Sequence, residues 1–237
     1  MTGPEESGRP LAGKRVLVTA GGSGFGAAIA RRFGAAGAQV VVGAASAESA
    51  AAVAGSMPGA VGVRADLLSP GDAQSLVGEA IERLGGLDIL VNSVHGAHAP
   101  APALELTIEQ FDAQVNLNVR SMFLAVKYSV PHLGDGSAIV NLASTAARRP
   151  QPLLAAYNAS VGSVITMTRG LAAELGPRVR VNAVCTSVPA GRPGRPIPMG
   201  READDDDVAG AALFLAAPRS EFLTGVCLEV TGGRDIE

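Results

Sequence analysis

Short apolar runs bounded by glycine alternate with longer, helix-length segments along almost the whole chain. The runs are rich in β-branched residues and continuously apolar, which is typical of strands covered on both faces. They lie at residues 15–19, 39–42, 59–63, 87–91, 138–142, 179–184 and 226–230. The helix-length segments lie at residues 24–37, 46–57, 69–85, 107–132, 151–176 and 205–217. This alternation predicts an α/β fold with a doubly wound, Rossmann-type parallel sheet of about seven strands in a single domain.

Three segments depart from this pattern. Residues 1–12 are polar and acidic where a secretory signal would be basic and then apolar, so we expect a flexible tail before a domain at 13–237. Residues 189–198 carry a proline every few positions, which predicts a surface loop. The acidic run at 204–207 precedes an apolar helix, and we expect it to cap that helix instead of binding a metal.

The composition limits the kinds of molecule that the chain is expected to bind. The chain has 237 residues, 47% of them hydrophobic, which is enough for one large domain with a substantial core. Aromatic residues make up only 3%, and the formal net charge is −3. Nucleic acid and membrane surfaces are therefore not expected partners, because stacking platforms and excess basic charge are both lacking. We expect a small-molecule substrate or another subunit.

The two cysteines, Cys185 and Cys227, lie far apart in the sequence and form neither a CxxC nor a zinc-binding pattern. The sequence therefore predicts no disulfide and no metal site, and it favours a cytoplasmic location.

A glycine-rich turn runs from Thr19 to Gly26, directly after the first predicted strand. Glycine lets backbone N–H groups approach a pyrophosphate, and the following helix N-terminus adds partial positive charge. A tight strand–helix connection without a ligand would use the same residues, but the position after the first strand favours dinucleotide binding.

On this turn the chain resembles the short-chain dehydrogenase/reductase family, and the resemblance extends over nearly all of the chain after the tail. The family's first glycine is Ala20 here, which costs about 1–2 kcal/mol if that position needs a positive φ. The resemblance implies a set of cofactor-binding residues: Thr19, Gly22, Gly24, Gly26, Asp66 beside the adenine, and Asn92.

The resemblance also implies a catalytic set. Ser144 precedes Tyr157 by 13 residues, the family's spacing, and Asn118 takes the place of the family's catalytic asparagine. In such a site, paired hydroxyls polarise a substrate carbonyl, and the tyrosine transfers a proton as hydride moves.

Val161 stands where the family has a lysine, four residues after Tyr157. A neutral side chain cannot lower the pKa of the phenol or relay a proton. With a pKa of about 10, roughly one phenol in a thousand would be ionised at neutral pH. Alcohol oxidation needs the phenolate as its base, so we expect it to be slow. Carbonyl reduction is hurt less, because the tyrosine already carries the proton. We therefore expect that any redox activity favours reduction.

The chain also departs from the family pattern in the segment that forms a lid over the substrate pocket and in the residues that select the cofactor. The segment 185–187, Cys-Thr-Ser, replaces the family's Pro-Gly, and Thr231 replaces an aspartate. The lid that follows is reduced to the proline-rich loop, which should leave the pocket open to water. The second strand ends in Ala44-Ala45-Ser46, without the carboxylate that binds an NAD ribose or the arginine that binds an NADP phosphate. We expect NADP(H) ahead of NAD(H).

Charged and titratable residues near the predicted site allow two interpretations each. His95 and His98 follow the fourth strand and could supply the acid or base that Val161 does not, or they could simply face solvent. Arg148 and Arg149 could bind a substrate anion, but we favour a solvated edge.

Three functions remain. We favour an atypical NADPH-dependent reductase of a carbonyl or hydroxyl compound, with an impaired proton relay. The first alternative is a non-redox enzyme that works without the cofactor's hydride and uses Ser144 and Tyr157 for isomerisation, dehydration, elimination or cyclisation. The second is a catalytically silent subunit paired with an intact relative. We expect either a homo-oligomer, which would be a dimer or a tetramer, or a hetero-oligomer with an intact relative.

Overall fold

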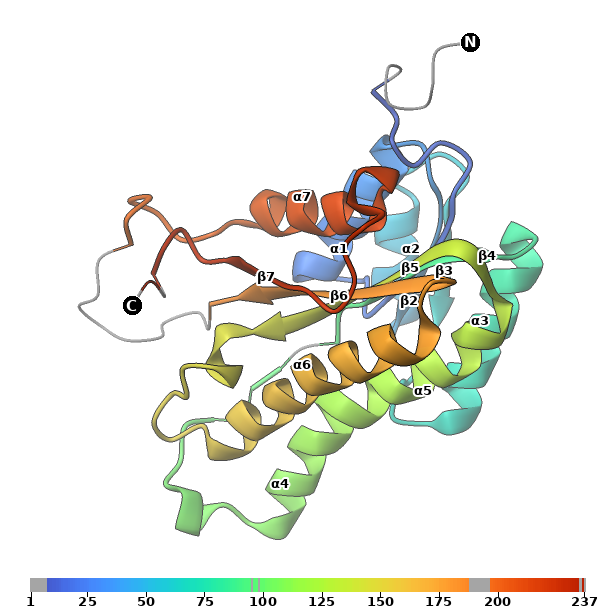
Figure 1. The fold of residues 1–237 in the computed structure, drawn as a ribbon. Coiled ribbons are helices and arrows are strands. Elements are labelled where there is room, and N and C mark those ends of the chain that lie inside the picture. Colours follow the sequence, from blue (N-terminus) through green and yellow to red (C-terminus); the bar gives the residue numbers. More distant parts are fainter. Residues whose placement is uncertain (1–7, 95, 98, 188–196, 235, 237) are drawn as a thin grey trace.

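Seven parallel strands form one twisted sheet in the order β3-β2-β1-β4-β5-β6-β7 (Figure 1), as the strand and helix alternation predicts. The computed structural model describes residues 8–94, 96, 97, 99–187, 197–234 and 236. The strands are β1 Arg15–Thr19, β2 Gln39–Ala44, β3 Val61–Arg64, β4 Leu87–Asn92, β5 Leu133–Ser144, β6 Val179–Thr186 and β7 Cys227–Val230. The central residues of β1, β2, β4 and β6 are buried on both faces, which explains their continuous apolar runs.

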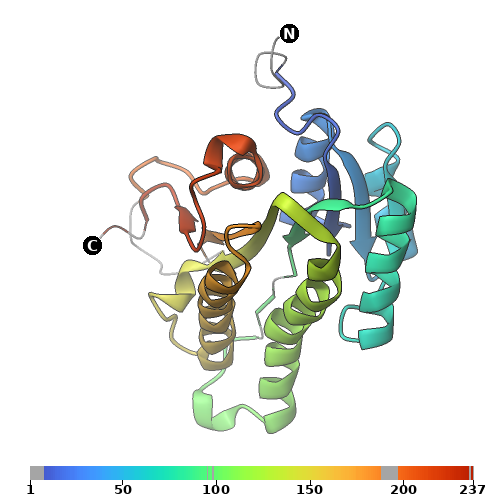
Figure 2. The ribbon, with the colours of Figure 1, turned by 45° about the vertical axis from the view of Figure 1, so that its right-hand side comes forward.

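Helices cover both faces of the sheet (Figures 1 and 2). One core lies on the side of α1 Gly24–Ala35, α2 Ala47–Ala54 and α7 Asp205–Ala216. The other lies on the side of α3 Pro70–Leu84, α5 Ser121–Ser129 and α6 Ala155–Leu175. α4, at Ile108–Val115, extends below the sheet in Figure 1 and leads toward α5. The carboxyl ends of the strands therefore lie between two helical layers, where ligands bind in such folds.

Two of the predicted helices differ from the structure. The segment 107–132 is divided into α4, a π-helical turn at Asn116–Arg120, α5 and a short 3₁₀ turn. The segment 151–176 becomes helical only at Ala155, because Pro152 precedes Leu153, whose φ of 65° lies in the left-handed region. Both differences lie beside the predicted catalytic residues.

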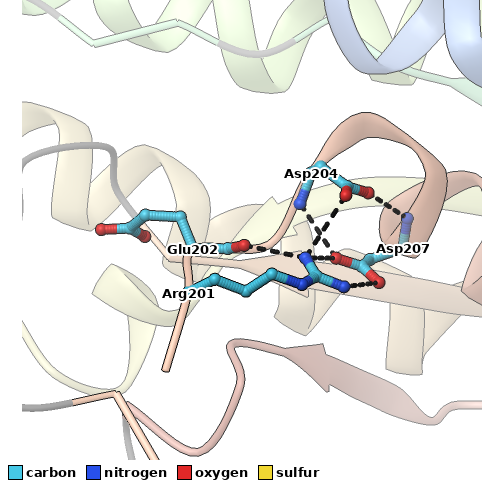
Figure 3. Close-up of polar contacts among 4 residues, drawn as sticks. All are labelled: Arg201, Glu202, Asp204 and Asp207. Atoms are coloured by element: carbon cyan, nitrogen blue, oxygen red, sulfur yellow. Dashed lines mark hydrogen bonds and ion pairs between the residues drawn. The ribbon is translucent and has the colours of Figure 1, made fainter. Parts of the chain in front are cut away.

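The acidic run caps α7, as expected. The Asp204 carboxylate accepts a hydrogen bond from the Asp207 N–H at 3.0 Å, and the Asp207 carboxylate accepts one from the Asp204 N–H at 2.9 Å. Arg201 donates to both carboxylates (Figure 3) and holds the pKa of Asp207 well below its ordinary value. The segment that enters α7 is thereby fixed to the start of the helix.

Part of the predicted N-terminal tail packs on the domain. Leu11 is fully buried, and its N–H donates to the Ala36 carbonyl at 3.0 Å. Most of the proline-rich loop, together with residues 1–7, His95 and His98, lies outside the described residues.

The prediction that the cysteines are unpaired is wrong: Cys185 and Cys227 form a disulfide. β6 and β7 are neighbours in the sheet, and their register brings the Cα atoms to 6.2 Å, within the range a disulfide spans. Local sequence patterns do not predict this contact, because it depends on the pairing of two strands whose cysteines are 42 residues apart in the sequence. Among the helices that the structure describes, none is both long and apolar enough to cross a membrane.

Candidate active site

The glycine-rich turn between β1 and α1 forms the floor of a groove at the carboxyl edge of the sheet. Ala20 has a φ of 49°, so the residue at the family's first glycine does adopt the strained, left-handed conformation. Gly24 also has a positive φ, of 50°, and the space beside its Cα is open. The side chain of Ser23 makes no capping hydrogen bond at the start of α1, which leaves the first N–H groups of that helix available to an anion.

Two glycines of the turn serve packing instead. A Cβ at Gly26 would lie 2.3 Å from Ser93 Oγ and 2.5 Å from the Ala20 carbonyl oxygen. A Cβ at Gly22 would lie 2.5 Å from Ser49 Oγ. These contacts bring α1 and α2 close to the sheet and hold the turn in place.

Two adjoining hollows extend this groove across the sheet edge. The first, of about 320 Å³, lies over the turn and is lined by Ala20, Ser23–Gly26, Ser93, Val94 and Leu117. The second, of about 270 Å³, lies beyond β2 and β3 and is lined by Ala20, Ala44, Ala45, Ala65–Leu68, Val94, Leu117 and Ser121. They share Ala20, Val94 and Leu117, so together they form an elongated site. This shape, with a helix N-terminus at one end, fits a dinucleotide.

The other predicted cofactor residues lie along this groove. Asp66 lines the second hollow, and its carboxylate accepts a hydrogen bond from the Leu68 N–H at 2.9 Å. Thr19 is buried and donates to the Val91 carbonyl at 3.2 Å. Asn92 is buried and donates to Asn141 at 2.9 Å, while its own side-chain oxygen has no partner among the described residues. The unpartnered oxygen leaves one acceptor at the sheet edge for a donor on a ligand.

The edge of the second hollow carries no acidic group on β2. The strand ends at Ala44, and Ser46 caps α2 by accepting a hydrogen bond from the Ser49 N–H. Glu48 in the first turn of α2 is exposed. A hydroxyl and a helix N-terminus, without a carboxylate on the strand, can accept either a ribose or its phosphate.

Ser144 and Tyr157 come together as their spacing predicts. Ser144 ends β5, and its Oγ accepts a hydrogen bond from the Ala146 N–H at 3.1 Å. Tyr157 lies in the first turn of α6, and the hydroxyls of Tyr157 and Ser144 are hydrogen-bonded. Two adjacent hydroxyls can polarise a carbonyl oxygen that binds beside them.

The surroundings of Tyr157 are apolar. Its side chain is 0% exposed and packs in a cluster with Ala146, Leu154 and Val161. Burial raises the pKa of Tyr157 to about 12, and the hydrogen bond with Ser144 opposes this only partly. At neutral pH, on the order of one phenol in a hundred thousand would be ionised.

Val161 lies one helical turn beyond Tyr157 and is 1% exposed. It fills the apolar cluster, so no ammonium acts on the phenol from this face. In the described part of the chain, no charged group shifts the pKa of Tyr157. Leu154 covers the cluster from the segment before α6, a contact that sequence reasoning missed. The only signal for it was a pair of leucines just before the predicted tyrosine.

Asn118 lies in the π-helical turn, and its amide is engaged by its neighbours. The side-chain oxygen accepts from the Gly96 N–H at 3.1 Å, and Nδ2 donates to the Gly96 carbonyl and to Ser160 Oγ, each at 2.9 Å. Ser160 donates in turn to the Tyr157 carbonyl at 2.8 Å. Asn118 thus ties the loop after β4 to α6. Ser160 belongs to the same hydrogen-bond network, which the sequence did not reveal, and the catalytic role of Asn118 stays a prediction.

Arg148 is ion-paired with Glu229 of β7 at 2.7 Å, which agrees with the interpretation that it belongs to a charged, partly exposed edge. Among the described residues, no group of three or more His, Cys, Asp or Glu side chains is arranged to hold a metal ion.

Comparisons with known proteins agree with this geometry. A family model described as enoyl-(acyl carrier protein) reductase matches residues 19–235. The chain is 40% identical over 245 residues to a 4-formylbenzenesulfonate dehydrogenase of Comamonas testosteroni, covering 93% of this chain and 97% of the relative.

Solved structures match over nearly the same length. A 3-ketoacyl-(acyl-carrier-protein) reductase from Brucella melitensis, complexed with NADH, has a TM-score of 0.89 at 39% identity, covering 95% of this chain and 100% of that one. A short-chain dehydrogenase from Burkholderia cenocepacia, in complex with NADP, has a TM-score of 0.87 at 35% identity, covering 95% and 99%.

Proposed function

The chain belongs to the short-chain dehydrogenase/reductase family, and we propose that it reduces a carbonyl group of a small molecule, with a nicotinamide cofactor bound in the groove at the carboxyl edge of the sheet. The observation that carries this proposal is the pair formed by Ser144 and Tyr157, in which burial keeps the phenol protonated. A protonated phenol is the form that reduction uses, because the carbonyl oxygen must receive a proton.

The residues that would bind the cofactor are the N-terminal turn of α1 for the pyrophosphate and the second hollow, with Asp66, for the adenine. When bound there, the cofactor would supply the hydride. Ala45 and Ser46 at the end of β2 offer no carboxylate to repel a ribose phosphate, so we propose NADP(H) as the preferred form. The relatives with bound cofactor include both forms, NADH and NADP.

The chain's own part in the reaction is to hold and deliver a proton. The Ser144 hydroxyl, oriented by the Ala146 N–H, would donate a hydrogen bond to the substrate oxygen. Tyr157 would give its proton to the same oxygen as an alkoxide forms there. An alkoxide is a much stronger base than a phenolate, so the transfer is downhill even from a phenol with a pKa near 12. The segment carrying Leu154 must move aside first, since Tyr157 is fully covered.

We further propose an aromatic carbonyl compound as substrate, because one relative is named for an aromatic aldehyde that bears a sulfonate. We also propose assembly into dimers or tetramers. Large exposed apolar side chains support this: Ile108, Phe111, Phe123 and Phe214 lie on helices, and Phe222 lies in a turn before β7.

The test begins with binding. NADPH and NADH are titrated into the purified chain, and their fluorescence reports binding of either form. No binding at millimolar cofactor would end the reductase proposal. NADPH consumption is then followed with a panel of aromatic and aliphatic aldehydes and ketones, including 4-formylbenzenesulfonate.

Variants then assign the activity to the site. Tyr157→Phe and Ser144→Ala should each lose at least about a hundredfold in turnover, as expected for a general acid and its partner. The only other tyrosine, Tyr128 on α5, provides a matched control, and Tyr128→Phe should keep full activity. Equal activity in Tyr157→Phe would contradict the proposed role.

A second candidate is supported by the burial of the catalytic pair. Ser144 and Tyr157 are both covered, and neither is among the described residues that line the two hollows. A chain that binds a cofactor but does not turn over would serve as a silent subunit beside an intact relative. Cofactor binding without turnover on the whole panel, with turnover restored by such a partner, would favour this candidate.

A further inference from the structure

The disulfide joins the two strands at one end of the sheet. β6 and β7 run side by side (Figure 1), and their register pairs Ala183 with Cys227 and Cys185 with Glu229. Cys185 therefore lies two residues beyond the partner of Cys227, on the same face of the sheet. The chain contains no other cysteine, so any intramolecular disulfide must join this pair.

This link lies close to the catalytic residues. Cys185 directly precedes Thr186, and Thr186 is the register partner of Ser144 on β5. Cys185 also belongs to the core that includes Val164 and Ile165 of α6, the helix that carries Tyr157. β7 is a short edge strand of four residues. The disulfide thus fastens the carboxyl end of β6, beside the candidate active site, to an edge strand of the sheet.

The two cysteines differ in exposure. Cys185 is 1% exposed, whereas Cys227 is only half-buried. Attack on a disulfide needs access to one sulfur, and the other leaves as a thiolate. Cys227 is therefore the cysteine that we expect a thiolate to attack.

We propose that Cys185 and Cys227 form a thiol–disulfide exchange site, which low-molecular-weight thiols reduce and low-molecular-weight disulfides re-form. A thiolate attacks Cys227 Sγ, the bond between the cysteines breaks, and the electron pair leaves on Cys185 Sγ, which takes up a proton. A second thiolate attacks the reagent sulfur of the mixed disulfide and releases Cys227, which is protonated in turn. The chain gains two electrons and two protons, and the reagent becomes its own disulfide.

The oxidation state should change the stability of this end of the domain. The closed loop spans a sequence separation of 42 residues and includes α7. Closing a loop of that length stabilises the folded chain, because it lowers the entropy of the unfolded chain. Dividing that stabilisation by the entropy of unfolding of a chain of this size predicts that reduction lowers Tm by about 5–10 °C. This inference does not rest on the proposed reduction of a carbonyl, because its readouts need no substrate or cofactor.

The experiment uses the full chain, incubated with oxidised glutathione or with dithiothreitol and then freed of reagent. Thiols are titrated under denaturing conditions, and Tm is measured for both forms. We expect no free thiol after glutathione disulfide, two after dithiothreitol, and the lower Tm in the reduced form. Cys227→Ser, which cannot form the bond, should show the same Tm after either treatment.

Two single variants test the order of attack. With oxidised glutathione, Cys185→Ala should form a mixed disulfide on the half-buried Cys227, detected by mass. Cys227→Ala should react much more slowly, since Cys185 is buried. Two free thiols in the wild-type chain after oxidised glutathione, or an identical Tm in both forms, would overturn the proposal.

Discussion

Replacing Val161 with lysine would place an ammonium one helical turn from Tyr157, inside the apolar cluster that now surrounds the phenol. Side chains four residues apart on a helix are neighbours, at about 6 Å. Two unit charges at about 6 Å interact by about 3 kcal/mol at an effective dielectric constant near 20, which equals about two pKa units. Burial now raises the pKa of Tyr157 from 10.0 to about 12, so the new charge should roughly cancel that shift.

Ultraviolet absorbance of the phenolate provides the assay. A pH titration of Val161→Lys is recorded as a difference against the same variant with Tyr157→Phe, which removes the contribution of Tyr128. The expected midpoint falls to about pH 10. Val161→Met is the matched control, because it adds length without charge, and its midpoint should stay near that of the wild type. If the lysine and methionine variants titrate together, the reasoning that the missing ammonium controls the phenol is wrong.

Three further predictions concern the turn, the cofactor and alkaline pH. Ala20→Gly should raise the free energy of unfolding by about 0.5–1 kcal/mol in urea titrations. Glycine removes the strain of the positive φ, but it also raises the conformational entropy of the unfolded chain, which offsets part of the stabilisation. An unchanged or lower stability would contradict the assigned strain. Ala45→Asp should weaken NADPH binding at least about tenfold and spare NADH, as a carboxylate repels the ribose phosphate; equal loss for both forms in fluorescence titrations would refute the proposed position. The folded chain keeps the Tyr157 proton up to about pH 12, whereas the unfolded chain releases it near 10.0, so stability should fall between these values. The wild type should lose up to about 3 kcal/mol more than Tyr157→Phe over this range in urea unfolding, and parallel losses would show that the phenol is not buried.

The fold could be predicted from the sequence because the strands contain short apolar runs, and because α2, α3, α4 and α7 each begin after a residue whose side chain caps the helix. Ser144 and Tyr157 could be paired because their spacing and local sequence match a family pattern. The burial of Tyr157 could not be predicted, because it depends on contacts with Leu154, which precedes α6, and with Ala146, which follows β5. The π-helical turn at Asn118 was hidden within one long helical pattern.

The disulfide was missed for a related reason. Cys185 and Cys227 become neighbours only through the register of β6 and β7, and no local pattern encodes that register. Contacts within an element follow from periodicity, whereas contacts between elements follow from how the strands and loops pack. The candidate active site is built mostly from contacts between elements.

The proposed reduction depends on a protonated Tyr157, whose phenolate is disfavoured by burial and by the neutral Val161 beside it. The most direct test is the pH dependence of alcohol oxidation by the wild-type chain, for the alcohol of whichever carbonyl compound it reduces. The logarithm of the oxidation rate should rise by one for each pH unit and should still be rising at about pH 10, the value for an unperturbed phenol. A plateau that begins near neutral pH would show that Tyr157 ionises easily, and it would contradict the proposal that burial keeps the phenol protonated.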